Sequence, residues 1–198
     1  MPETQNIPEW LQREVNDYFV KPLNFQPATV LDIGANVGAF AIRAHREWPA
    51  AHVICYEPMP FNVDKLRQNV DAEWCQIVPC AVRERTGVDD IYLGDMFVTN
   101  GFRKGTRQTD TRISVSCVAA SEIPPCDLIK IDTEGCEVEI LANLDLTKTK
   151  AILLEHHSKS DAATIKKMLT PKYRILHDES NLEVGTMIFV LAHNSDLP

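Results

Sequence analysis

Short apolar segments alternate with segments of helical periodicity through most of this chain. Apolar runs at 28–34, 51–58, 127–135 and 151–157 predict buried strands, and the segments between them repeat apolar residues every three or four positions. Such alternation implies parallel strands joined by right-handed crossovers, with helices on both faces of the sheet. We therefore predict an α/β fold built on a doubly wound sheet.

The remaining elements follow from the same patterns. We expect helices at 9–20, 37–48, 62–70, 136–144 and 161–170, and further strands at 76–82, 113–118, 173–178 and 186–193. The helix at 161–170 is expected to be capped by Ser160 or Asp161. Between 83 and 118 the pattern is weaker, and we predict a strand within 89–100 and a loop at 101–112. We divide the chain into a helical lead-in, 1–28, and one domain, 29–198.

Composition narrows the class of protein. The chain has 198 residues and a net charge of −8, which disfavours broad binding to nucleic acid. No apolar run approaches a membrane span, and the polar start MPETQNIPEW does not resemble a secretory signal, so we expect a cytoplasmic protein. Six cysteines without a C-x-x-C pair are expected to be reduced and structural, and we predict no metal site.

The stretch VLDIGANVGAF is a glycine-bearing turn that follows the first buried strand. In a doubly wound sheet this turn contacts the ligand, and glycines allow close approach to the backbone. Gly34 and Gly38 are present, but the middle glycine of the dinucleotide pattern G-x-G-x-x-G is missing. Asp32 would also repel a pyrophosphate. The turn therefore favours S-adenosylmethionine, which carries a sulfonium and no phosphate, over NAD.

Glu57 ends the second predicted strand, where an acid can accept both ribose hydroxyls of an adenosyl group. Taken alone, Glu57 could equally be a solvated acid at the end of a strand. Its position after the Asp32 turn, in the expected order, favours an adenosyl site.

Three segments resemble the FkbM-type family of S-adenosylmethionine-dependent methyltransferases: VLDIGANVGAF, CYEPMPFNVDKLRQNV and DLIKIDTEGCEVEIL. The resemblance runs from about residue 29 to about 158. It implies the class I methyltransferase fold, which is Rossmann-like, with a seven-stranded sheet whose last strand is antiparallel. It also implies O-methylation of a hydroxyl on a small molecule or sugar by in-line transfer.

On this basis the site residues fall into two groups. The predicted cofactor-binding residues are Asp32, Gly34, Ala35, Asn36, Gly38, Glu57, Pro58, Ala81 and Val82. The predicted catalytic residues are Asp132, Glu134, Glu155 and His157. Asp132 is expected to orient the acceptor, although it or Glu134 could instead cap the following helix. Glu155 and His157 alternate onto one face of a strand, which makes His157 a candidate base or a structural histidine.

A basic segment at 101–112 suggests an acceptor with a negative group. Arg103, Lys104 and Arg107 lie there in an otherwise acidic chain, and arginine suits paired oxygens of carboxylate or phosphate. A solvated loop that balances acids elsewhere is the alternative. Two other functions stay open: a catalytically silent binding module, and a nucleic-acid methyltransferase, which the charge and the missing N-P-P-Y or D-P-P-Y motif disfavour. The sequence predicts a small-molecule acceptor and does not define the oligomeric state.

Overall fold

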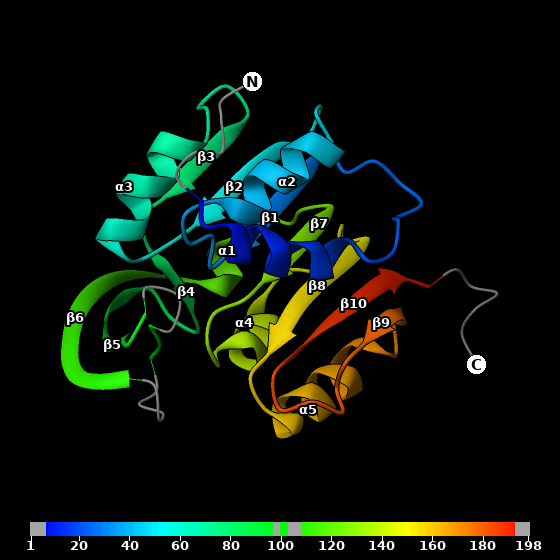
Figure 1. Cartoon of the computed structure of the whole chain (residues 1–198). Coiled ribbons are helices and arrows are strands. Elements are labelled where there is room, and N and C mark those ends of the chain that lie inside the picture. Colours follow the sequence, from blue (N-terminus) through cyan, green and yellow to red (C-terminus); the bar gives the residue numbers. More distant parts are fainter. Residues whose placement is uncertain (1–6, 97–99, 103–107, 193–198) are drawn as a thin grey trace.

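The main sheet confirms the predicted doubly wound architecture. The computed structural model describes residues 7–96, 100–102 and 108–192. Seven strands lie in the order β3-β2-β1-β7-β8-β10-β9 (Figure 1). β10 runs antiparallel to the other six strands, and it pairs with β8 on one side and β9 on the other. The strands are β1 (Thr29–Ile33), β2 (His52–Tyr56), β3 (Cys75–Val78), β7 (Leu128–Ile131), β8 (Ala151–His156), β9 (Tyr173–Asp178) and β10 (Gly185–Leu191).

Helices cover both faces of this sheet. On one face lie α1 (Glu9–Glu14), the 3-10 helix η1 (Val15–Phe19), α2 (Ala39–Glu47) and α3 (Pro60–Asn69), which share one apolar core with alternate strand residues. The opposite face packs against α4 (Glu137–Asn143) and α5 (Lys159–Leu169). Successive side chains along each strand point to opposite faces of the sheet, so each buried strand contributes residues to both cores.

Helix α5 begins slightly earlier than its sequence pattern indicates. Its N-cap is Ser158, whose backbone is extended and whose Oγ accepts a hydrogen bond from the Asp161 amide at 3.0 Å. The predicted caps, Ser160 and Asp161, are therefore wrong, because both residues already lie inside the first turn.

The strand predicted at 76–82 is two strands in two sheets. β3 ends at Val78, and β4 (Ala81–Arg83) joins a second sheet with β5 (Gly87–Gly94) and β6 (Gln108–Ala119), in the order β4-β6-β5. Pro79 lies between them and has no amide hydrogen to continue the ladder. The Cys80 amide instead donates to the Val78 carbonyl at 2.9 Å, so the chain turns out of the main sheet.

This second sheet stands beside the main one, next to α3 and α4 (Figure 1). Its strands β5 and β6 form an antiparallel pair, and a short 3-10 helix, η2 (Ala120–Glu122), connects β6 back toward β7. The predicted loop at 101–112 is therefore wrong from residue 108 onward, where β6 begins. No pattern in the sequence signalled that the weak strands near 89–100 and 113–118 would form a sheet of their own.

The N-terminal segment packs against α2. Tyr18 and Phe19 place their rings 5.7 and 5.6 Å from that of Phe40, and Phe19 also meets Trp48 at 5.6 Å. Segment 1–28 was predicted as a lead-in, and its described part contributes to the core of the domain. Within the described ranges, no helix has the length and apolar character needed to cross a membrane.

Candidate active site

A cavity of about 360 Å³ opens at the carboxyl ends of β1, β2, β7 and β8. This is the edge where ligands bind in doubly wound sheets, and the volume falls within the range of small-molecule sites. The N-terminal helices and the second sheet form its walls. Residues predicted as site residues that line it are Gly34, Ala35, Asn36, Glu57, Pro58, Ala81, Val82, Asp132, Glu134, Glu155 and His157.

Two described residues of the predicted site, Asp32 and Gly38, are not among the residues that line this cavity. Asp32 is fully buried, and Gly38 is the N-cap of α2. The predicted substrate residues Arg103, Lys104 and Arg107 lie outside the described residues. The described residues Asn100 and Phe102 line the cavity.

The turn after β1 requires its glycines for packing. Gly34, Asn36 and Gly38 all have positive φ, at +79°, +51° and +92°. A Cβ on Gly34 would lie 1.8 Å from the Asp132 carbonyl oxygen, and one on Gly38 would lie 2.6 Å from Leu66 Cδ1. Neighbouring chain segments thus require these glycines, whereas the predicted approach of a ligand to this turn stays a prediction.

Glu57 lines the cavity at the end of β2 and is held by three hydrogen bonds. Its carboxylate accepts hydrogen bonds from the amides of Asn36 at 2.8 Å and Met59 at 2.9 Å, and from Asn62 Nδ2 at 3.3 Å. Burial raises the pKa of Glu57 to about 6, although these donors and Lys130 oppose the rise. Three donors on two oxygens fix the carboxylate in place while leaving acceptor capacity toward the cavity. The geometry fits the predicted contact with ribose hydroxyls.

The affinity for S-adenosylhomocysteine is expected to fall as the pH is lowered through about 6. The protonated carboxyl of Glu57 loses an acceptor that the ribose hydroxyls need, so affinity should drop about tenfold between pH 7.5 and pH 5. Glu57→Gln should bind weakly and show no such pH dependence. Calorimetric titrations at several pH values check this, and a wild-type affinity independent of pH would contradict it.

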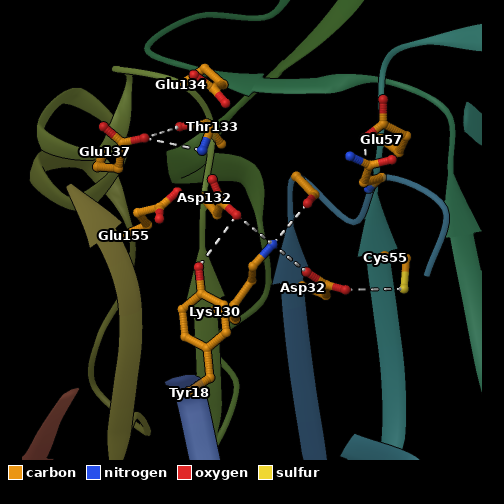
Figure 2. A network of polar contacts seen from close by, with 12 residues as sticks. Tyr18, Asp32, Cys55, Glu57, Lys130, Asp132, Thr133, Glu134, Glu137 and Glu155 are labelled. Carbon is orange, nitrogen blue, oxygen red and sulfur yellow. Dashed lines mark hydrogen bonds and ion pairs between the residues drawn. The ribbon is translucent and has the colours of Figure 1, made fainter. Parts of the chain in front are cut away.

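Lys130 joins the ends of β1 and β7 and is itself one of the residues that line the cavity. Its Nζ donates to the Gly34 carbonyl at 2.8 Å and lies 3.2 Å from Asp32 Oδ1 and 3.7 Å from Asp132 Oδ2 (Figure 2). Burial opposes the charge on Lys130, but Asp32 and Asp132 raise its pKa. The carboxylate of Asp32 is therefore engaged by a buried lysine, and direct contact of Asp32 with the cofactor is not supported by this geometry.

Asp132 follows β7 and points toward the cavity from the sheet edge (Figure 2). Its backbone amide bonds the Ile33 carbonyl at 3.1 Å, which holds the residue beside the turn after β1. Tyr18 donates its hydroxyl to Asp132 Oδ2 at 3.3 Å. Tyr18, from the N-terminal segment, thus contacts Asp132, which the sequence analysis predicts to orient the acceptor.

His157 lies among carboxylates on both of its ring nitrogens. Nδ1 is 3.1 Å from Glu137 Oε1, while Nε2 is 3.4 Å from Glu155 Oε2 and 3.6 Å from Glu134 Oε2. Burial alone would lower the pKa of His157, but the bonds to Glu137 and Glu155 raise it to about 11. An imidazolium that holds its proton at neutral pH is a poor general base, so the predicted role of His157 as base is not supported. The predicted shared face of Glu155 and His157 is observed.

The turn between β7 and α4 is held by Glu137. Its Oε1 accepts from the Thr133 amide and Oγ1 at 3.0 and 3.1 Å, and from the Gly135 amide at 3.0 Å. Helix α4 has Cys136 as N-cap and no side-chain cap, so the alternative reading of Asp132 or Glu134 as a cap is wrong. Glu134 has φ of +56° and lines the cavity, and burial raises its pKa to about 7.

Sequence reasoning missed three residues of the site. Lys130 could have been found, because a lysine inside the buried run DLIKI needs an acidic partner. Glu137 lies in the segment DLIKIDTEGCEVEIL, which carries the family resemblance. Its contact with His157 joins the start of α4 to the end of β8, and the sequence gives no sign of that pairing. Tyr18 contacts Asp132 from a distant part of the chain, and no local sequence pattern predicts such a contact.

Comparisons with known proteins identify the family of this chain. The model of the FkbM methyltransferase domain family matches residues 32–175. The hexuronic acid methyltransferase AglP of Haloferax volcanii is 26% identical over 146 residues, covering 70% of this chain and 60% of AglP. The 31-O-demethyl-FK506 methyltransferase FkbM of Streptomyces tacrolimicus is 25% identical over 230 residues, covering 93% of this chain and 88% of that protein.

Solved structures share the fold at low sequence identity. The fibrillarin pre-rRNA processing protein of Methanococcus jannaschii aligns with a TM-score of 0.55 at 14% identity, over 91% of this chain and 75% of that one. Precorrin-6y C5,15-methyltransferase of Geobacter metallireducens aligns with a TM-score of 0.51 at 12% identity, over 96% and 92%. The chain therefore belongs to the FkbM methyltransferase domain family, and its main sheet has the Rossmann-like fold that it shares with these solved structures.

Proposed function

We propose that this methyltransferase methylates a hydroxyl oxygen of a small molecule or sugar. The observation that carries the proposal is the position of Asp132, Glu134 and Glu155, whose side chains line the same cavity as the Gly34 turn and Glu57. Carboxylates accept hydrogen bonds from hydroxyl groups and can take up a hydroxyl proton. The names of two relatives, a hexuronic acid methyltransferase and a 31-O-demethyl-FK506 methyltransferase, support an oxygenated acceptor.

The residues suit the demands of an in-line displacement. When bound, S-adenosylmethionine supplies a methyl group on a positive sulfur, and the S–CH₃ bond breaks as the O–CH₃ bond forms, with the electron pair passing to sulfur. Asp132 would orient the acceptor hydroxyl and accept its proton, while Tyr18 and Lys130 keep that carboxylate in position. The walls from the N-terminal helices and the second sheet would exclude water.

The cavity is also suited to this cofactor rather than to a dinucleotide. Acidic residues line it at several points, which favours a ligand with a sulfonium and an ammonium over a pyrophosphate. These acids are Glu14, Asp17, Glu57, Asp132, Glu134 and Glu155. Asp32 is paired with Lys130 and does not line the cavity. The acids that do line it are therefore the physical reason to expect S-adenosylmethionine rather than NAD.

A transfer assay with a metabolite extract tests the proposal. The purified chain is incubated with extract and S-adenosylmethionine labelled in its methyl group, and products are separated by mass. We expect release of S-adenosylhomocysteine in equal amount to a labelled product that carries the methyl group on a former hydroxyl oxygen, as a methyl ether. Release at background level with every extract fraction would favour a silent binding module, and label on nitrogen or on nucleic acid would also contradict the proposal.

We further propose that the acceptor carries a carboxylate or phosphate. The proposal rests on the basic residues Arg103, Lys104 and Arg107, and on the lining residues Asn100 and Phe102 that come just before them. Changing the three basic residues together to Gln should raise the apparent KM for the acceptor and flatten its salt dependence, because fewer screened attractions remain. An unchanged KM at low and moderate salt would point to a neutral acceptor.

A further inference from the structure

The end of the cavity formed by β7 and β8 has more negative than positive groups. Among the described residues there, five carboxyl groups gather around Lys130 and His157. The acids are Asp32, Asp132, Glu134, Glu137 and Glu155. Lys130 lies on the Asp32 side, where it contacts Asp32 and Asp132. In these ion pairs, Glu134 and Glu155 both contact the ring of His157 and neither contacts Lys130. Most of the excess negative charge therefore lies beside His157.

We propose that Asp132, Glu155 and His157 bind one divalent cation of the magnesium and manganese class. One ligand atom from each residue lies within 4.8 Å of the other two. In an octahedral site with metal–ligand distances of about 2.1 Å, ligand atoms lie roughly 3 to 4 Å apart, so small side-chain movements would close the site. Two carboxylates and one imidazole suit such a cation, and Glu134 lies within reach as a further oxygen ligand.

The orientation of His157 is an independent indication of a ligand. A histidine that binds a metal through one nitrogen usually donates the other N–H to a carboxylate, which fixes the ring. His157 Nδ1 lies 3.1 Å from Glu137 Oε1, and the Glu137 side chain is fully buried. Because Thr133 and Gly135 also donate to that oxygen, the imidazole is held from behind and Nε2 faces the cavity acids.

A bound cation would replace the proton on Nε2 of His157. It would also reconcile an acid-lined cavity with an anionic acceptor, since carboxylate or hydroxyl oxygens of the acceptor could complete its coordination. A metal-bound hydroxyl loses its proton more readily, which would assist the transfer to oxygen. This role rests on the proposed O-methylation, whereas the binding of the cation does not.

The test uses Mn²⁺ as a paramagnetic probe. The full chain is treated with chelator, saturated with S-adenosylhomocysteine and titrated with Mn²⁺ while the free ion is followed by electron paramagnetic resonance. We expect one Mn²⁺ per chain with a dissociation constant below about 1 mM, displaced by Mg²⁺. Spin-echo modulation from a directly bound nitrogen should identify His157 in the wild-type protein. No binding at that concentration, or binding without a nitrogen signal, would overturn the proposal.

Matched variants locate the site. His157→Gln and Glu155→Gln should weaken Mn²⁺ binding by about tenfold or more, and Glu137→Gln by roughly 10–100-fold, because it positions the imidazole. Glu73→Gln, at an exposed acid in the turn before β3 that does not line the cavity, should bind as the wild type does. Equal affinity in all four variants would overturn the assignment. Since no methyl transfer is measured, failure here is distinguishable from failure of the proposed O-methylation.

Discussion

Asp132→Asn is expected to lower turnover by about a hundredfold or more while leaving cofactor binding nearly unchanged. The amide keeps the size of the carboxylate and can still accept from Tyr18, but it has no negative charge and cannot take up a proton. Proton-transfer groups typically contribute 10²- to 10⁴-fold, roughly, to a rate. Single-turnover kinetics with the acceptor and calorimetry with S-adenosylhomocysteine measure the two quantities separately.

A suitable control is Asp64→Asn, which removes a carboxylate from the exposed face of α3. Asp64 pairs with Arg67 at 3.3 Å, and both side chains are largely exposed, so turnover should match the wild type. If Asp132→Asn retained wild-type turnover, Asp132 would have no part in orienting the acceptor or taking its proton. A loss of cofactor affinity as large as the loss of turnover would show that Asp132 acts on cofactor binding.

Gly34→Ala is expected to destabilise the fold by about 3 kcal/mol or more. The new Cβ would lie 1.8 Å from the Asp132 carbonyl oxygen, and this contact is between backbone segments of two neighbouring strands. A left-handed conformation at a residue with a Cβ adds about 1 to 2 kcal/mol of strain. Relief of the clash requires β1 and β7 to separate at the cavity edge. Urea unfolding of both proteins measures the difference in free energy.

Gly135→Ala provides the matched control for backbone strain. Gly135 also has positive φ, at +103°, but a Cβ there would meet nothing within 4 Å. Its cost should therefore be only the strain, about 1 to 2 kcal/mol. If the two variants were equally destabilised, the close approach of Gly34 to Asp132 would not contribute to stability.

The main sheet could be predicted because its signals are local. Buried strands such as 28–34 and 151–157 and the helices between them follow from hydrophobic periodicity, and the crossover rule then fixes parallel pairing. The second sheet could not, since β5 and β6 are half-exposed strands of mixed pattern whose pairing depends on one another. Pro79 was the one available sign that 76–82 would divide.

The candidate site was predicted residue by residue only where it follows a strand end. Gly34, Glu57, Asp132 and Glu155 lie where the sequence placed them, because the carboxyl ends of parallel strands meet at one edge. The burial of Asp32 and the charge state of His157 depend on Lys130 and Glu137, which reach them from other elements. Such contacts are decided by tertiary packing, and periodicity contains no information about them.

Calorimetry with S-adenosylhomocysteine and NAD tests most directly whether this cavity is the adenosyl site of a methyltransferase. We predict one S-adenosylhomocysteine per chain, and weak binding of NAD. Glu57→Ala should reduce the binding free energy of S-adenosylhomocysteine by roughly 1–3 kcal/mol, the range for a lost hydrogen bond to a charged group, while Glu73→Gln should not. Tight binding of NAD with no heat from S-adenosylhomocysteine, or binding of S-adenosylhomocysteine indifferent to Glu57, would contradict the account.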